Sequence, residues 1–104
     1  MKPRPTLELL QILDKAILET PYFPGLCMLI QYLWIERIIT APEYNILLLY
    51  IQRYKPKTAI YYYPYWWPRG AKEPRHQFLQ ELIKKEQRWN RLLQVLRFWQ
   101  SWRH

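Results

Sequence analysis

The stretch that decides the fold is residues 40–54, Thr-Ala-Pro-Glu-Tyr-Asn-Ile-Leu-Leu-Leu-Tyr-Ile-Gln-Arg-Tyr. The Thr40 hydroxyl can cap the first turn of a helix, and Glu43 can bond back to the Thr40 amide, the reciprocal pattern called a capping box. Apolar side chains then recur at three- and four-residue steps. The stretch therefore predicts a helix that begins after Thr40 and ends near Tyr54. Its expected core stripe is Tyr44, Leu47, Leu48 and Ile51.

Two helices are predicted upstream of this one. Residues 7–19 carry Leu and Ile at helical spacing, and Thr6 is the expected N-cap. Residues 21–25, Pro-Tyr-Phe-Pro-Gly, break regular hydrogen bonding and form a connector. Residues 26–37 are apolar on nearly every side, so we expect a central helix covered by its neighbours.

Downstream the character of the chain changes twice. Residues 56–74 combine four prolines with a run of Tyr and Trp, which predicts a long loop of the kind that often carries function. Residues 75–103 contain no Gly or Pro and predict a long helix. Its broad apolar face, expected to be buried, consists of Phe78, Leu79, Leu82, Ile83, Trp89, Leu92, Leu93 and Leu96. The chain is thus predicted to be mainly α: one compact four-helix domain over residues 1–104, with a long aromatic Pro-rich loop before a long C-terminal helix.

The composition and net charge of the chain limit the classes of molecule that it is expected to bind. A chain of 104 residues fits one domain. Its net charge of +8 attracts polyanions, so nucleic acid, nucleotides, an anionic membrane surface and acidic proteins are the candidate partners. The one cysteine, Cys27, excludes an intramolecular disulfide and favours a reducing, cytoplasmic location. The most apolar window, residues 26–39, is too short and too polar for a transmembrane segment.

The predicted ligand site lies where the aromatic loop meets the last helix. Aromatic rings can stack on nucleobases, arginines can bind phosphate, and a helix N-terminus favours anions. Cations crowded at such an end are unfavourable unless an anion binds there. We therefore predict a site for a nucleotide, a cyclic nucleotide signal or single-stranded nucleic acid, with no metal or cofactor. Its residues are Tyr62, Tyr65, Trp66, Trp67, Arg69, Lys72, Arg75 and His76. The alternative is that the aromatic rings fill the core and the cations are solvated.

A second predicted surface lies on the last helix, where a cationic stripe continues into apolar residues. Trp and Arg are enriched at protein interaction hot spots, so this surface suits a homo-oligomer contact or an acidic surface of a host protein. Its residues are Arg88, Arg91, Val95, Phe98 and Trp102. Two alternatives remain: the helix packs across the other three, or it lies in an anionic membrane interface.

Catalytic motifs are scarce. The two histidines, His76 and His104, have no cysteine or carboxylate at a metal or acid–base spacing. Cys27 stands in the most apolar helix, where a small core residue is the favoured interpretation over a nucleophile. The sequence therefore predicts a binding protein and not an enzyme, with protein inhibition as the alternative function.

Four short patterns resemble small accessory proteins of tailed bacteriophages: Gly25-Leu26-Cys27, Ile38-Ile39-Thr40 with Glu43, Tyr65-Trp66-Trp67-Pro68, and Arg75 to Leu79. The resemblance covers about residues 25–83 and assigns no active-site residues. It implies a phage accessory protein in the bacterial host cytosol, in a class that includes anti-defence inhibitors and proteins that sequester nucleotide signals.

Overall fold

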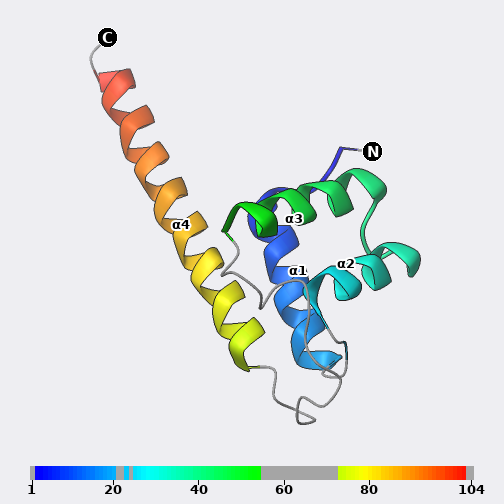
Figure 1. Ribbon diagram of the computed structural model, residues 1–104. Helices are drawn as coiled ribbons and strands as arrows, with labels where there is room; N and C mark the ends of the chain where they lie inside the picture. The colour runs from blue at the N-terminus through cyan, green and yellow to red at the C-terminus, as the bar shows by residue number, and fades with distance from the viewer. Residues whose placement is uncertain (1, 21–22, 24, 55–72, 103–104) are drawn as a thin grey trace.

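A computed structural model describes residues 2–20, 23, 25–54 and 73–102. These residues form four helices, α1 (Thr6–Glu19), α2 (Leu26–Ile35), α3 (Ala41–Tyr54) and α4 (Glu73–Trp102), as Figure 1 shows. The described ranges contain no strand, so the mainly α, four-helix prediction is confirmed. The aromatic Pro-rich loop lies outside them. Among the described helices, none has the length and apolarity needed to cross a membrane.

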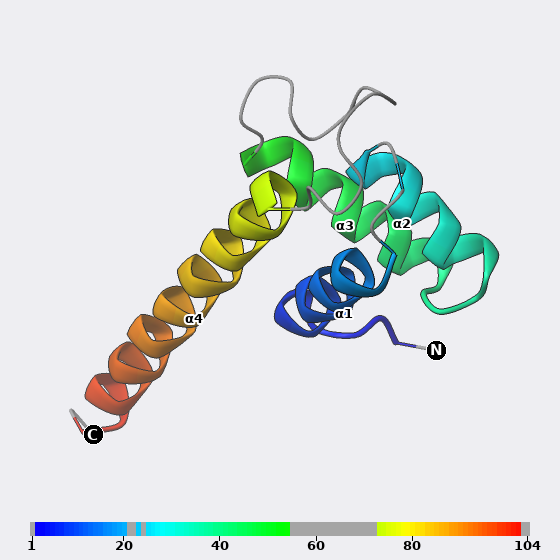
Figure 2. The ribbon, with the colours of Figure 1, turned by 90° about the horizontal axis from the view of Figure 1, so that it is seen from below.

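The core lies around α1. This helix packs against each of the other three, most extensively against α4, while α2 packs on α3. Figure 2 shows the same arrangement from below, with α4 beside α1 and α3. The fully buried side chains come from all four helices and from the turn before α3: Leu9, Leu10, Leu13, Ile17, Leu26, Leu29, Ile30, Ile39, Leu47, Ile51 and Leu79.

The two predicted helix caps have different outcomes. The α3 capping box is confirmed: the Thr40 amide donates to Glu43 Oε1 at 2.8 Å, and the Glu43 amide approaches Thr40 Oγ1 at 3.4 Å. The Thr6 cap is wrong, because Thr6 is the first residue inside α1 and Pro5 takes the N-cap position without a side-chain bond. The Pro5 carbonyl still accepts the Leu9 amide at 3.1 Å, so α1 begins one residue earlier than expected.

Glu43 also forms a buried ion pair that no local pattern indicates. Arg4 donates from Nη2 to Glu43 Oε1 at 2.7 Å and from Nε to Oε2 at 2.8 Å. The Arg4 backbone amide adds a third bond to Oε2 at 2.8 Å, and Nη2 donates to the Ile38 carbonyl at 2.6 Å. The hydrogen bonds from Arg4 hold the pKa of Glu43 at about 2, against an ordinary value of 4.5. The pair joins the segment before α1 to the first turn of α3.

The end of α2 has an unusual backbone. Arg37 adopts φ of 60°, in the left-handed region that glycine normally occupies. Its amide bonds to the Trp34 carbonyl at 3.0 Å, and the Ile38 amide bonds to the Leu33 carbonyl at 2.9 Å. These two bonds define a Schellman motif, which ends α2 at Ile35, two residues before the predicted end. Arginine in this conformation costs about 1 kcal/mol relative to glycine.

The prediction that α2 is covered on all sides is wrong. One face is buried, but Trp34 and Ile35 on the other face are 43% and 73% exposed. The reason is position: α2 packs against α1 and α3 on one face. On the other face, Trp34 stacks on Tyr44 of α3 with ring centroids 4.9 Å apart and still stays 43% exposed.

The predicted buried face of α4 is confirmed only in its first half. Leu79, Leu82 and Ile83 are buried. The prediction is wrong for Trp89, Leu92 and Leu96, which are 58%, 49% and 51% exposed. At about 1.5 Å per residue, a 30-residue helix is about 45 Å long, more than twice the length of the 14-residue α1. The end of α4 therefore extends beyond the helices that could cover it (Figure 1). We call residues 87–102 the distal half of α4.

Candidate functional site

Arg75, at the start of α4, is held inside the fold. Arg75 is only 3% exposed, and its Nη1 donates to the Phe23 carbonyl at 2.6 Å. This contact ties α4 to the connector between α1 and α2. Arg75 was predicted to bind phosphate, and its described contacts are those of a residue that holds two segments together.

His76 and Gln80 both contact Asp14 on α1. Gln80 Nε2 donates to Asp14 Oδ2 at 2.6 Å. His76 Nδ1 lies 2.7 Å from Asp14 Oδ1, a close approach in which neither atom has a well-aligned hydrogen bond. The three side chains form a polar link between α1 and α4, and His76 remains 29% exposed at its side chain.

The structure describes two of the eight predicted ligand residues, Arg75 and His76. Arg75 and His76 are neighbours on α4; Arg75 donates to the Phe23 carbonyl, and His76 lies beside Asp14 of α1. The remaining predicted ligand residues lie outside the described ranges: Tyr62, Tyr65, Trp66, Trp67, Arg69 and Lys72.

A pocket that sequence reasoning missed lies between the end of α3 and the middle of α4. Its volume is about 490 Å³, within the range typical of small-molecule sites. Aromatic and charged side chains line it, and we call it the aromatic–cationic pocket. Its lining residues are Tyr50, Arg53, Tyr54, Lys85, Glu86 and Trp89.

Tyr54 is the centre of this pocket. The Arg53 guanidinium lies 5.5 Å from the centroid of the Tyr54 ring, and Lys85 Nζ lies 5.6 Å from it. Both distances suit cation–π attraction, which holds two positive charges beside one aromatic ring. The Tyr50 ring packs against Tyr54 with centroids 4.8 Å apart. One side of the pocket is therefore both aromatic and positively charged.

Glu86 is the acidic member of the pocket, and it already has a partner. The Tyr50 hydroxyl donates to Glu86 Oε2 at 2.7 Å. Burial, followed by this hydrogen bond, raises the pKa of Tyr50, so its hydroxyl stays protonated and remains a donor. The bond fixes Tyr50 and Glu86 as the base of the pocket between α3 and α4.

Sequence reasoning missed this pocket for a definite reason. Arg53 and Tyr54 end one helix, whereas Lys85 stands about thirty residues later in another. Tyr50 and Tyr54 follow the helical repeat and resemble core residues, and Lys85 belongs to no motif. One feature of the sequence does point to this pocket: Arg53 and Tyr54 stand just before the aromatic loop.

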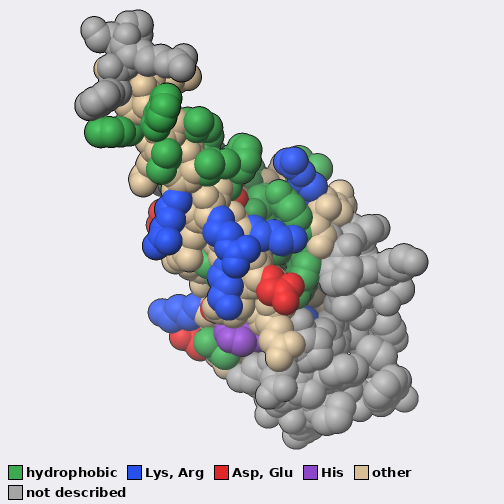
Figure 3. All heavy atoms as spheres, turned by 90° about the vertical axis from the view of Figure 1, so that its left-hand side faces the viewer, with side chains coloured by type: hydrophobic (Ala, Val, Ile, Leu, Met, Phe, Trp, Pro, Cys, Tyr) green, Lys and Arg blue, Asp and Glu red, His purple; other side chains and the backbone are tan. Residues whose placement is uncertain are grey.

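The predicted interaction surface lies on the distal half of α4. Arg88 and Arg91 are exposed, as are Val95 and Phe98, which are 55% and 65% accessible. Trp102 is the last residue of α4, and its side chain lies outside the description. Figure 3 shows Lys and Arg side chains gathered over the middle of α4 and hydrophobic side chains along its far part.

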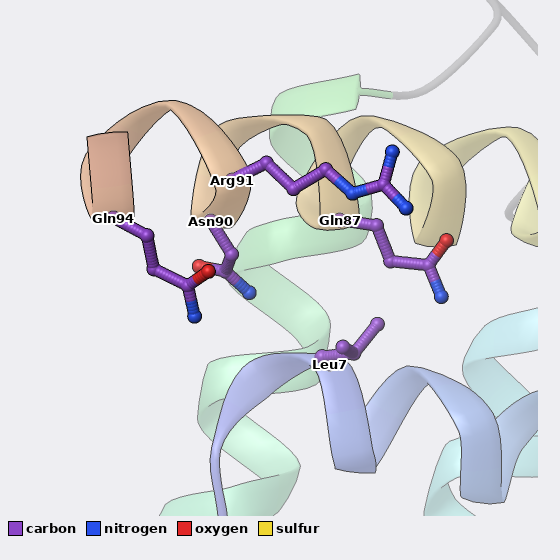
Figure 4. Close-up of a pocket in the computed structure, with 5 residues that line it drawn as sticks. All are labelled: Leu7, Gln87, Asn90, Arg91 and Gln94. Carbon is purple, nitrogen blue, oxygen red and sulfur yellow. The ribbon is translucent and has the colours of Figure 1, made fainter. Parts of the chain in front are cut away.

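The other side of the distal half is polar. Gln87, Asn90 and Gln94 extend from α4 toward Leu7 of α1, while Arg91 runs along the helix (Figure 4). They line an open groove of about 400 Å³. Amide side chains bond well to water, so this side of the helix needs no cover.

Cys27 carries the one thiol of the chain. Burial raises the pKa of the Cys27 thiol, which disfavours the nucleophilic thiolate. In residues 2–20, 23, 25–54 and 73–102, no group of three His, Cys, Asp or Glu side chains is placed to hold a metal ion.

Comparison with known proteins assigns no family to the chain. No protein-family model matches it, and neither a curated protein nor a solved structure gives a match. The resemblance to phage accessory proteins therefore stays a prediction, and the function has to be argued from the geometry.

Proposed function

We propose that this chain is a non-enzymatic binding protein for a phosphate-bearing aromatic ligand: a nucleotide, a cyclic nucleotide signal or single-stranded nucleic acid. The observation that carries the proposal is the aromatic–cationic pocket, in which Arg53 and Lys85 both lie beside Tyr54. The net charge of +8 adds a long-range attraction for any such ligand.

Each part of the pocket has a role in this proposal. Tyr54 offers a ring face on which a base can stack, a contact worth about 1–3 kcal/mol per base in single-strand binding proteins. Arg53 can bind phosphate with two parallel hydrogen bonds, and Lys85 supplies a compact positive charge. Glu86 repels phosphate, so the phosphate is expected on the side of Arg53 and Lys85.

The predicted loop residues belong to the same proposal. The segment that contains Tyr62, Trp66 and Arg69 follows Tyr54 directly in the chain. We propose that its aromatic and cationic side chains add to the ligand contacts made by the pocket. If Arg69→Ala combined with Arg53→Ala weakens binding no further than Arg53→Ala alone, the loop is no part of the site.

Calorimetry with a panel of nucleotides, cyclic oligonucleotides and short single strands tests the pocket. Arg53→Ala and Lys85→Ala should each weaken binding about tenfold, the effect of one lost charge-assisted contact. Arg97→Ala and Lys15→Ala are the matched controls, because they remove the same charge outside the pocket; they should change affinity less than about twofold. An equal loss in all four variants would mean nonspecific attraction of polyanions and would contradict a defined site.

The resemblance to phage proteins gives the proposal a biological form. If the ligand is a nucleotide signal, the chain would act by sequestering it in the host cytosol, which is an anti-defence role. Native mass spectrometry of protein purified from bacterial cytosol tests this directly. A defined nucleotide retained at fixed stoichiometry supports it, whereas protein that ignores every nucleotide offered removes this function.

A second candidate function is inhibition of a host protein through its acidic surface. The exposure of Arg88, Arg91 and Phe98 on the distal half of α4 favours it. Its test is a chain that ends at Leu93, which should lose the complex while circular dichroism still reports the remaining helices. A complex that survives this truncation would exclude the distal half as the inhibitory surface.

A further inference from the structure

The distal half of α4 carries a regular apolar stripe whose members are about half exposed or more. Its four members follow one another at intervals of three, four and three residues: Trp89, Leu92, Leu96 and Trp99. All four are exposed, Trp99 by 61%. A 3.5-residue repeat of this kind keeps apolar side chains on the seam between two supercoiled helices.

The seam begins inside the folded body. Phe78, Leu82 and Lys85 occupy the preceding positions of the same repeat; Phe78 packs against the core, Leu82 is buried, and Lys85 is exposed. Beyond them the repeat continues into solvent, because α1 and α3 end. An exposed apolar stripe bordered by polar residues is typical of a surface that pairs with another protein.

The stripe is symmetric along the helix, so the same stripe of a second copy matches it in the antiparallel direction. Trp89 and Trp99 each stand five residues from Gln94, and Leu92 and Leu96 each stand two residues from it. We propose that two copies of the chain pair through the distal halves of α4, with their helices antiparallel and a twofold axis at the level of Gln94. Each Trp89 then packs beside Trp99 of the second copy, and each Leu92 beside Leu96.

The lengths of the segments fit this arrangement. On the α3 side, Tyr50 bonds to Glu86, which stands eight residues before Gln94. Trp102, the last residue of α4, stands eight residues after it. The helix of the second copy therefore reaches the body of the first and ends there. The two bodies lie at opposite ends of the helix pair.

Charge favours the antiparallel direction. Each copy has a net charge of +8, and a parallel pair would place the two bodies side by side. It would also bring the two Lys85 residues to the same level of the seam, since Lys85 occupies the repeat position between Leu82 and Trp89. Like charges opposite each other are destabilising. The antiparallel pair separates the two bodies from each other and the two Lys85 residues from each other.

The area available suits a dimer of moderate affinity. Trp89 and Trp99 are each about three-fifths exposed, and four aliphatic residues lie along or beside the stripe. If pairing covers the exposed surface of these six side chains, it buries about 600 Å² per copy. This is near the lower limit for a specific interface. We therefore expect dissociation constants in the micromolar range and an equilibrium that dilution reverses.

Sedimentation equilibrium over concentrations from about 1 to about 200 μM tests the pairing. The wild-type chain should change from monomer to dimer, and Leu96→Asp should raise the dissociation constant at least tenfold, because it places a charge in the seam of both copies. Gln94→Asp is the matched control: it adds the same charge on the polar side and should leave the constant within about threefold. Because Leu96 is half exposed, both variants should keep the wild-type circular dichroism.

A wild-type chain that stays monomeric throughout would overturn the proposal, and so would a dimer that Leu96→Asp leaves intact. Binding of the monomer to anionic vesicles or to an acidic protein, without a dimer, would assign the stripe to that partner instead.

Electron–electron distance measurements decide the direction. A spin label attached through Glu81→Cys in a Cys27→Ser background stands thirteen residues from Gln94, outside the paired region. In the antiparallel dimer the two labels should be about 40 Å apart, from a rise of about 1.5 Å per residue. A distance below about 20 Å would mean parallel helices and would contradict the twofold axis at Gln94.

Discussion

The two halves of α4 belong to one continuous helix, yet they have opposite surroundings. In the first half, Leu79 and Leu82 are buried, and His76 and Gln80 reach Asp14 on α1. In the distal half, Trp89 and Leu96 follow the same helical repeat but are more than half exposed. A repeat in the sequence therefore tells which side of a helix is apolar. Whether that side is covered depends on how far the neighbouring helices extend.

The largest expected effect comes from one matched pair of truncations. Leu82→Ala should lower the free energy of unfolding by about 2–5 kcal/mol, because it leaves a cavity in the core. Leu96→Ala should change it by less than about 0.5 kcal/mol when measured on dilute, monomeric protein. Urea unfolding at low concentration measures both. Similar losses in the two variants would mean that the distal half contributes to the fold of a single copy.

A smaller loss is expected from the partly buried ion pair between Arg4 and Glu43, which joins the segment before α1 to the first turn of α3. Glu43→Gln removes the charge that Arg4 and the Thr40 amide bond, and it should cost about 2–3 kcal/mol. The value is below that of a fully buried pair because the Arg4 side chain is 33% exposed. Glu36→Gln, at an exposed position, is the control and should have almost no effect. An equally silent Glu43→Gln would show that the pair is unimportant for stability.

The same pair predicts how stability depends on pH. The pKa of Glu43 is lowered from 4.5 to about 2 in the folded protein, so its contribution is fully present above about pH 5 and is lost as the pH falls toward 2. After allowance for the partial exposure of Arg4, we expect about 1–2 kcal/mol from this carboxylate. Denaturant unfolding between pH 6 and about pH 2.5 should show a steeper acid loss in the wild type than in Glu43→Gln. Parallel curves would contradict the lowered pKa.

The smallest effect is a gain in stability at the end of α2. Arg37→Gly should stabilise the protein by about 0.5–1 kcal/mol, because glycine adopts φ of 60° without strain. Glu36→Gly is the control, since residue 36 has negative φ, and it should destabilise. Thermal unfolding distinguishes the two signs, and a destabilised Arg37→Gly would contradict the Schellman motif.

Local signals explain which parts of the fold were predictable. The capping box at Thr40 and Glu43 and the breaker-free run after residue 74 lie within a few residues of the elements that they define. The bond between Arg4 and Glu43 spans 39 positions, and no short pattern indicates it. The Thr6 cap failed because Pro5 can occupy the same position, and sequence alone does not choose between them.

The candidate site was less predictable than the fold. The aromatic–cationic pocket depends on the packing of α3 against α4, which brings Tyr54 and Lys85 together. The predicted cluster was built instead from residues close together in the chain, and six of its eight members lie outside the described ranges. A cation near a helix start can serve a backbone carbonyl, here that of Phe23, as well as a ligand.

Hydrogen exchange of the α4 amides at several protein concentrations tests the central claim most directly. We predict that residues 75–86 are equally protected at every concentration, whereas residues 88–101 gain protection as the concentration rises and the second copy binds. A distal half that is already fully protected in dilute protein, or one that never gains protection, would contradict the account.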